Sequence, residues 1–325
     1  MKPYWNAVYR RLNLTLTPGG PGNTSAERYP DRPIRFIVPF AEGGPGDILA
    51  RLIGQKLTAS WGQPVIVENR PGAGGTIGSE LGARSAPDGH TLILASSTHA
   101  INPSLYAKLP YDTVKDFQPI TLMISMPNIL VVNSSLPVNS LEDLITLARS
   151  KPGQLKYASG GVGTPSHLGA ELLKIMTGVD IVHVLYKGHA PAGAALRKGD
   201  VSMMFDAILL ALPEIRAGKV KALAVTSAKR SSVAQEVPSA AESGLPGFDF
   251  SPGVGVLVRA GTPNDIVNKL YKEIVSILHL PEIQERLTKD GAEIVGNTPE
   301  QYAAYIEQEI IKWAKVAKAS GIRAQ

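Results

Sequence analysis

The chain contains no cysteine, which excludes disulfide bonds, cysteine-ligated zinc and thiol nucleophiles. It also has no apolar run of the length that a membrane span needs, so direct membrane insertion is not expected. The net charge of +5 is modest, and Lys and Arg are scattered instead of forming a basic stripe interleaved with aromatic residues. This distribution argues against a nucleic-acid partner.

The composition is that of a folded globular protein. A length of 325 residues with 44% hydrophobic residues suggests about two domains. Near the start, Arg10 and Arg11 precede the segment 12–17, which is too short and too polar for the hydrophobic part of an export signal. A Gly/Pro/Asn/Ser linker follows at 18–25. We expect residues 1–28 to form a mobile segment outside the fold.

A glycine-rich segment at 39–47 lies between a predicted strand and a predicted helix. The strand is the β-branched and aromatic segment 34–38, and apolar residues at helical spacing begin at Ile48, with Asp47 placed to cap the helix. Glycines let backbone N–H groups converge, and a helix N-terminus adds about half a positive charge. The segment is therefore a candidate anion site, although such loops are common in α/β domains and most bind nothing.

The same order of elements recurs along the first third of the chain. A predicted strand at 65–69 is followed by the loop 70–75 and a helix over 76–85, and a strand at 91–95 ends in Ser96–His99. Strands that alternate with helices predict a parallel sheet, in which all three polar loops lie at the carboxyl ends of the strands.

Residues 155–206 repeat this arrangement. A strand ends at Ser159 before the glycine loop 160–167 and a helix over 168–177; a strand at 181–186 and a helix to Arg197 follow; and a third strand ends at Asp206. Two similar lobes predict a ligand in the cleft between them. Crossings near 123–128 and 249–255 predict a hinge. We expect an α/β fold in two lobes, the first over 29–124 and 251–325 and the second over 125–250.

Seven segments, in register between Tyr29 and Ile322, resemble the Bug receptors, the extracytoplasmic solute-binding proteins of tripartite tricarboxylate transporters. They are Pro39-Phe40-x-x-Gly43-Gly44-x-x-Asp47, Glu68–Gly75, Pro87–Gly89, Ala100–Tyr106, Gly163–Leu168, Tyr186–Gly188 and Met204–Asp206. The resemblance implies a type II periplasmic-binding-protein fold, a periplasmic location, and membrane subunits of a transporter as partners. It also implies a small carboxylate ligand, held by backbone amides, hydroxyls and water instead of an arginine.

The expected ligand-binding residues lie at the strand ends of both lobes. They are Phe40, Ala41, Glu42, Gly43, Gly44, Asp47, Ser97, Thr98, Ser159, Gly163, Thr164 and Asp206. We expect a monomer without cofactor or catalytic activity. We also expect no metal site, since His99 and His167 lack partners at metal-ligand spacing.

Three segments depart from the family pattern. Ala207–Leu210 stands where Asn-Leu-Pro-Ser is common, Pro252-Gly253-Val254 where an aromatic pair is frequent, and Glu42 where a small residue or proline is usual. Glu42 in a cleft would repel further negative charge and disfavour tricarboxylates, whereas Glu42 directed into water would change little.

A hydrolase built from Ser159, His167 and Asp206 in the same cleft is the alternative function. The sequence has no Gly-x-Ser-x-Gly elbow and no Walker loop, and no carboxylate lies near His167 in the sequence to orient it. These absences favour a binding protein over an enzyme.

Overall fold

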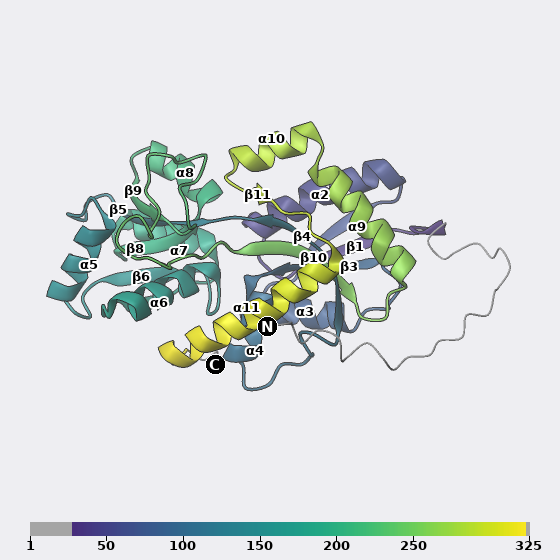
Figure 1. Cartoon of the computed structure of the whole chain (residues 1–325), viewed down its shortest axis with the longest axis horizontal. Coiled ribbons are helices and arrows are strands. Elements are labelled where there is room, and N and C mark those ends of the chain that lie inside the picture. Colours follow the sequence, from purple (N-terminus) through teal and green to yellow (C-terminus); the bar gives the residue numbers. More distant parts are fainter. Residues whose placement is uncertain (1–27, 323–325) are drawn as a thin grey trace, which may run out of the picture.

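The computed structural model describes residues 28–322. The mobile segment expected over residues 1–28 therefore lies outside the described residues, apart from Arg28. Helices α2 to α11 surround two separate β-sheets, which form two lobes. Figure 1 shows the first lobe on the right and the second on the left, with β4 and β10 between them.

The first lobe is built on a six-stranded sheet. Its strands in spatial order are β11 (Glu293–Ile294), β4 (Phe117–Ser125), β10 (Gly253–Arg259), β3 (Thr91–Ser96), β1 (Ile34–Val38) and β2 (Val65–Asn69). Because β1 pairs in parallel with both β2 and β3, the loops after these three strands meet at one edge. Two groups of helices pack on the sheet: α2 (Pro45–Trp61) with α9 (Asn264–Leu278) and α10 (Pro281–Lys289), and α3 (Thr76–Ala83) with α4 (Ser97–Leu105) and α11 (Pro299–Ser320).

The second lobe is built on a five-stranded sheet. Its spatial order is β7 (Val182–Leu185), β6 (Lys156–Ser159), β8 (Met203–Ala207), β5 (Asn128–Asn133) and β9 (Val220–Val225). Strand β6 pairs in parallel with β7 and β8, as predicted from the repeated strand–loop–helix pattern. Its helices are α5 (Leu141–Ser150), α6 (Pro165–Thr177), α7 (His189–Lys198) and α8 (Ile208–Arg216).

Two sequence expectations about local structure were wrong. The apolar segments 120–123 and 129–132, on either side of the first crossing, suggest a single strand between the lobes, but they lie in two strands, β4 and β5, of different sheets. Residues 97–99 belong to the first turn of α4, not to a loop, because the Ser96 side chain caps that helix by accepting the backbone N–H of Thr98.

The two crossings between the lobes are joined to each other by hydrogen bonds. Thr226, which is fully buried, accepts the backbone N–H of Asn128 on its hydroxyl at 2.8 Å and donates its own backbone N–H to the Asn128 carbonyl. The Thr226 carbonyl accepts the backbone N–H of Phe250. In addition, the backbone N–H of Met126 in the first crossing donates to the carbonyl of Pro252 in the second. The crossings therefore form one hydrogen-bonded unit.

Helix α11 makes a third connection between the lobes. Trp313 of α11 is fully buried in a cluster with Ile101 and Leu105 of α4, Leu168 of α6 and Phe250 of the second crossing. Figure 1 shows α11 extending from the first sheet towards α6. Separating the lobes here would expose this apolar cluster, which is unfavourable.

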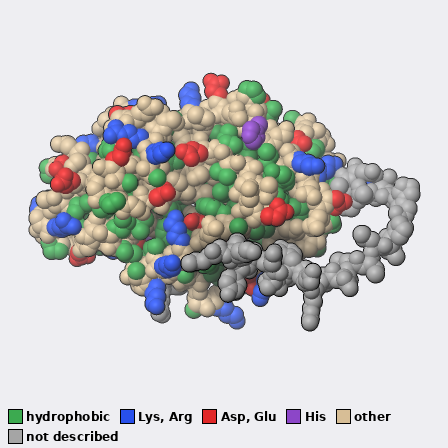
Figure 2. Space-filling view, in the orientation of Figure 1, with side chains coloured by type: hydrophobic (Ala, Val, Ile, Leu, Met, Phe, Trp, Pro, Cys, Tyr) green, Lys and Arg blue, Asp and Glu red, His purple; other side chains and the backbone are tan. Residues whose placement is uncertain are grey.

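The distribution of charge and the apolarity of the helices can be described for residues 28–322. On the face drawn in Figure 2, acidic and basic side chains are interspersed. No helix between residues 28 and 322 is long and apolar enough to cross a membrane.

The Thr226 hydroxyl gives a test of the joined crossings. We expect Thr226→Val, which keeps the shape, to leave buried backbone groups without partners and to cost about 1–3 kcal/mol of unfolding free energy. Urea denaturation measures this cost, and Thr226→Ser, which keeps the hydroxyl, is the matched control. Equal stability of the Val variant and the wild type would contradict the role assigned to this hydroxyl.

Candidate functional site

The two glycine loops have the same local structure where they enter their helices. Gly44 is the N-cap of α2 and Pro45 its first residue, while Thr164 and Pro165 occupy the same places in α6. The residues before the caps, Gly43 and Gly163, have φ values of +79° and +75°, a region that favours glycine. The two loops are therefore structural duplicates, one in each lobe.

The side chain of the third residue of each helix accepts a hydrogen bond from the glycine that precedes the N-cap. Asp47 accepts the Gly43 N–H at 2.9 Å, and His167 accepts the Gly163 N–H on Nδ1 at 3.0 Å. The sequence predicted that Asp47 is the N-cap of this helix, and this prediction was wrong because Gly44 is the N-cap. Pro45 is suited to the first helical position and starts the helix two residues before Asp47.

Asp47 is the centre of the hydrogen bonds in the first loop. Its side chain is only 3% exposed and accepts Nε of Arg51 at 3.0 Å and Nδ2 of Asn69 at 3.0 Å. Burial alone would raise the pKa of Asp47, but the bonds from Arg51, Gly43 and Asn69 outweigh it and leave the pKa below its ordinary value. The carboxylate is charged and fully engaged at neutral pH.

Glu42 lies on the outside of the first loop. Its side chain is 78% exposed and lies 3.2 Å from Nη2 of Arg51. Its neighbour Ala41 is exposed, and Phe40 is half-buried, with its carbonyl accepting Nδ2 of Asn69. The placement of Glu42 corresponds to the outward-facing alternative, so repulsion of ligand charge by this residue has no geometric support.

The second loop is closed by its own hydrogen bonds. The Thr164 hydroxyl donates to the Gly161 carbonyl at 2.7 Å and lies 2.9 Å from the Ser166 hydroxyl, which accepts the Gly160 N–H. Ser159, at the end of β6, is fully buried, so it supports the loop from below.

A stack of aromatic rings lies beneath the second loop. The His167 and His183 ring centroids are 4.3 Å apart, and Tyr157 stacks on His183 at 4.7 Å. Burial lowers the pKa of His167 to about 4, so the ring is neutral at pH 7 and Nδ1 accepts the Gly163 N–H. His183, whose Nε2 lies 2.6 Å from the Ser159 hydroxyl, was missed in the sequence because nothing in a short strand distinguishes a structural histidine.

The three residues of the alternative hydrolase each have a different partner. Ser159 contacts His183, His167 accepts the Gly163 amide, and Asp206 lies beside His189. A nucleophile needs its base within hydrogen-bonding reach and access to substrate, and Ser159 has no exposed surface. The structure does not assemble this triad.

Asp206 is the next-to-last residue of β8 and is buried. Its side chain is 10% exposed, and Nδ1 of His189 lies 3.2 Å from its Oδ1. Burial raises the pKa of Asp206 to about 7, although the Ala207 amide and Arg197 oppose this rise. Burial and Arg197 lower the pKa of His189. Both shifts favour the uncharged forms, so this contact has little ion-pair character.

Ser97 and Thr98 are both buried in the first turn of α4. The Thr98 hydroxyl lies 2.9 Å from that of Ser96. Ser97 lines a cavity of only about 10 Å³ beside Tyr302 and Tyr305 of α11. That volume is about the space of one water molecule. Because its other lining residues include Tyr302 and Tyr305, Ser97 lies next to α11 and not at the glycine loops.

Loops from the two lobes meet at the strand ends. A Cβ atom at Gly74 would lie 3.4 Å from the Val162 carbonyl, and one at Gly163 would lie 2.5 Å from Cδ1 of Leu105 in α4. Phe40 of the first loop lies beside Gly75, next to this contact. The structure therefore brings the first and second glycine loops to the same region between the lobes.

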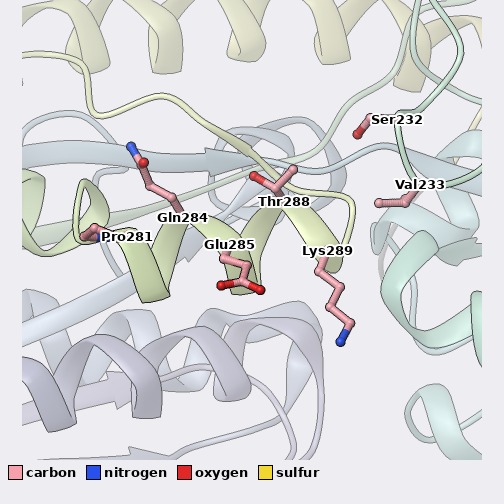
Figure 3. A pocket seen from close by; sticks show the side chains of 7 residues that line it. All are labelled: Ser232, Val233, Pro281, Gln284, Glu285, Thr288 and Lys289. Atoms are coloured by element: carbon pink, nitrogen blue, oxygen red, sulfur yellow. The ribbon is translucent and has the colours of Figure 1, made fainter.

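A second, larger concavity lies elsewhere between the lobes. It is an open groove of about 560 Å³ lined by Ser232, Val233, Pro281, Gln284, Glu285, Thr288 and Lys289. Figure 3 shows Glu285 and Lys289 projecting from α10, with Ser232 and Val233 on the facing segment. The groove combines one carboxylate with one ammonium and lacks the converging amides of the loops, so we place the candidate site at the loops. Among residues 28–322, no three His, Asp or Glu side chains are placed to share a metal ion.

A family model, a curated relative and two solved structures match this chain over most of its length. The family model described as the tripartite tricarboxylate transporter family receptor matches residues 49–322. The chain is 38% identical to Protein BugT of Bordetella pertussis over 309 residues, covering 94% of this chain and 95% of BugT. It is similar to the solved structure of R. palustris Rpa4515 with adipate, with a TM-score of 0.87, 38% identity and coverage of 91% and 99% of the two chains. MatC from Rhodopseudomonas palustris with bound malate has a TM-score of 0.83, 37% identity and coverage of 89% and 99%.

The hydrogen bonds of Asp47 predict that the two acidic residues of the first loop, Asp47 and Glu42, differ in their contribution to stability. Asp47→Ala leaves the Gly43 amide without its acceptor and removes one of the two acceptors of Asn69 Nδ2, and we expect it to cost about 1–3 kcal/mol of unfolding free energy. Glu42→Ala removes only an exposed ion pair and should leave the melting temperature unchanged. Thermal unfolding of both variants measures the contrast. Equal losses in the two would contradict the network.

Asp206 predicts a pH dependence of stability. Because its folded pKa of about 7 exceeds the unfolded value of about 3.9, its contribution is full below about pH 4 and is lost as pH rises to about 7. Asp206→Asn removes this loss and should be more stable than the wild type at about pH 8, by on the order of 1–4 kcal/mol, but not at about pH 4.

Melting temperatures across pH measure this effect. Asp200→Asn, an exposed position in the same lobe, is the control and should follow the wild type. A gap between Asp206→Asn and the wild type that does not change with pH would contradict the buried, protonated Asp206.

Proposed function

The chain belongs to the tripartite tricarboxylate transporter receptor family, and on this basis we propose that it is a periplasmic receptor that captures a small carboxylate between its two lobes. The observation that supports this most is the duplication of the glycine loop, with a helix N-terminus behind each copy. First-turn N–H groups of a helix have no intrahelical acceptor and favour an anion.

The chemistry of the loops suits a carboxylate held without an arginine. Neither segment 39–47 nor segment 159–167 contains Arg or Lys, and the nearby Arg51 is engaged by Asp47 and Glu42. Three or four N–H bonds to a charged group, at roughly 1.5–3 kcal/mol each, suffice for micromolar binding after ordering costs. The structural neighbours Rpa4515 and MatC were solved with adipate and malate, which are both dicarboxylates.

The proposal includes closure and delivery. Residues 29–124 with 251–325 and residues 125–250 would move as two lobes about the joined crossings, with the cluster around Trp313 remaining packed. The closed monomer would then present the ligand to the membrane subunits of a tripartite transporter. The hydrolase alternative has less support, because Ser159, His167 and Asp206 are bonded to other residues.

Thermal unfolding with a panel of acids tests the proposed function. A ligand at about 100 times its Kd stabilises the folded state by about 2.7 kcal/mol, which raises the melting temperature by several degrees. We expect this shift with at least one dicarboxylate of three to six carbons and no shift with its neutral diamide, and NMR should show the acid unchanged. A shift from the diamide as large as that from the acid, or consumption of the acid, would contradict a carboxylate receptor.

Gly163 tests the contact between the lobes. An Ala side chain at 163 would lie 2.5 Å from Cδ1 of Leu105, closer than carbon atoms pack, so either the Leu105 side chain or the two lobes must move apart here. Gly178→Ala is the matched control, because Gly178 has a similar φ of +69° but open space around it. We expect Gly163→Ala to weaken binding of the best acid at least about tenfold relative to Gly178→Ala, as measured by calorimetry. Equal affinities would mean that the contact does not accompany binding.

A further inference from the structure

Asp206 and His189 form a buried polar pair that is not satisfied within the described residues. The Asp206 side chain is nine-tenths buried, yet its Oδ1 has no hydrogen-bond partner among residues 28–322. His189 Nδ1 lies 3.2 Å from this oxygen without the geometry of a hydrogen bond. Buried carboxylate oxygens are nearly always hydrogen-bonded, and one left without a partner carries a desolvation cost. A donor supplied by a ligand would remove that cost.

The pair lies beside the second glycine loop. Strands β6 and β8 are parallel neighbours with Ala158 opposite Met204, so the second loop, which follows Ser159, leaves the sheet beside the end of β8 where Asp206 lies. A Cβ atom at Gly160 would lie 3.1 Å from the backbone N of His189. A ligand bound at the second loop would therefore be near Asp206 and His189.

The surroundings of Asp206 do not supply the missing donor. Arg197 of α7 is directed to Glu214 of α8, at 3.9 Å, so its charge is already shared. The Ala207 amide donates to the Asp206 carboxyl group, but the next side chains, Ala207 and Ile208, are apolar. The stretch 207–210 has no polar side chain that could reach back to Oδ1.

We propose that Asp206, together with His189, recognises a hydrogen-bond donor on the carbon next to the ligand's carboxylate. This inference rests on the proposed function and narrows its ligand to 2-hydroxy or 2-amino carboxylates. A hydroxyl or an ammonium at this carbon donates to Oδ1 of Asp206, and the imidazole of His189 borders the same group. An unsubstituted acid leaves the oxygen without its donor.

Three acids with the same carbon chain test the proposal. Succinate, malate and aspartate differ only in the group at the second carbon, which is hydrogen, hydroxyl or ammonium. We expect calorimetry to give malate or aspartate an affinity at least about tenfold higher than succinate, and the better of the two identifies the donor. Asp206→Ala should abolish this advantage, so that malate and aspartate bind no more tightly than succinate, whereas Asp200→Ala should keep the advantage.

Asp206→Asn provides a variant of the same size in case the alanine variant does not fold. It keeps one acceptor oxygen but no negative charge, so an ammonium should lose more affinity than a hydroxyl. Equal affinities for all three acids, or an advantage that persists in both Asp206 variants, would overturn this inference but not the carboxylate receptor. If none of these acids, nor any dicarboxylate of three to six carbons, binds the wild type, the proposed function itself fails.

Discussion

The candidate site depends on one local interaction that occurs twice. In each lobe, the third residue of a helix accepts the N–H of the glycine that precedes the helix cap, at 2.9 Å from Gly43 and 3.0 Å from Gly163. This bond holds a positive-φ glycine just before the helix, whose first-turn amides have no intrahelical acceptor. The anchors differ in charge: Asp47 is anionic and balanced by Arg51, while His167 is neutral. An anionic ligand therefore meets less opposing charge at the second loop than at the first.

Where the lobes remain in contact also follows from packing. The buried cluster around Trp313 joins α4, α6 and α11, and the two crossings are hydrogen-bonded at Thr226. On another side, a Cβ at Gly291 would lie 2.6 Å from Ile208 of the second lobe, so only glycine allows this contact between the lobes. Ile208 of α8 and Leu287 of α10 also belong to one buried core cluster, so opening the lobes on this side exposes apolar surface as well.

Much of the fold was predictable because strand, glycine loop and helix have strong local signals. The strands at 34–38, 65–69 and 156–159 begin and end where the sequence indicated. The helix starts were less predictable: the patterns at Asp47 and Ser97 left out the effects of Pro45 and of the Ser96 cap. For the site, sequence could place Gly43, Gly163 and Asp206 at strand ends, but not the direction of Glu42 or the partner of Ser159. The first depends on Arg51, one helical turn beyond Asp47 on α2, and the second on His183, which is 24 residues away and reaches Ser159 through strand pairing.

The most direct test of this account is a crystal structure of the protein with the dicarboxylate that gives the largest thermal shift. The account predicts a ligand carboxylate within hydrogen-bonding distance of first-turn amides of α2 or α6, with the glycine loops of both lobes contacting the ligand. A carboxylate bound in the groove beside α10, or bound by side chains of one lobe alone, would contradict it.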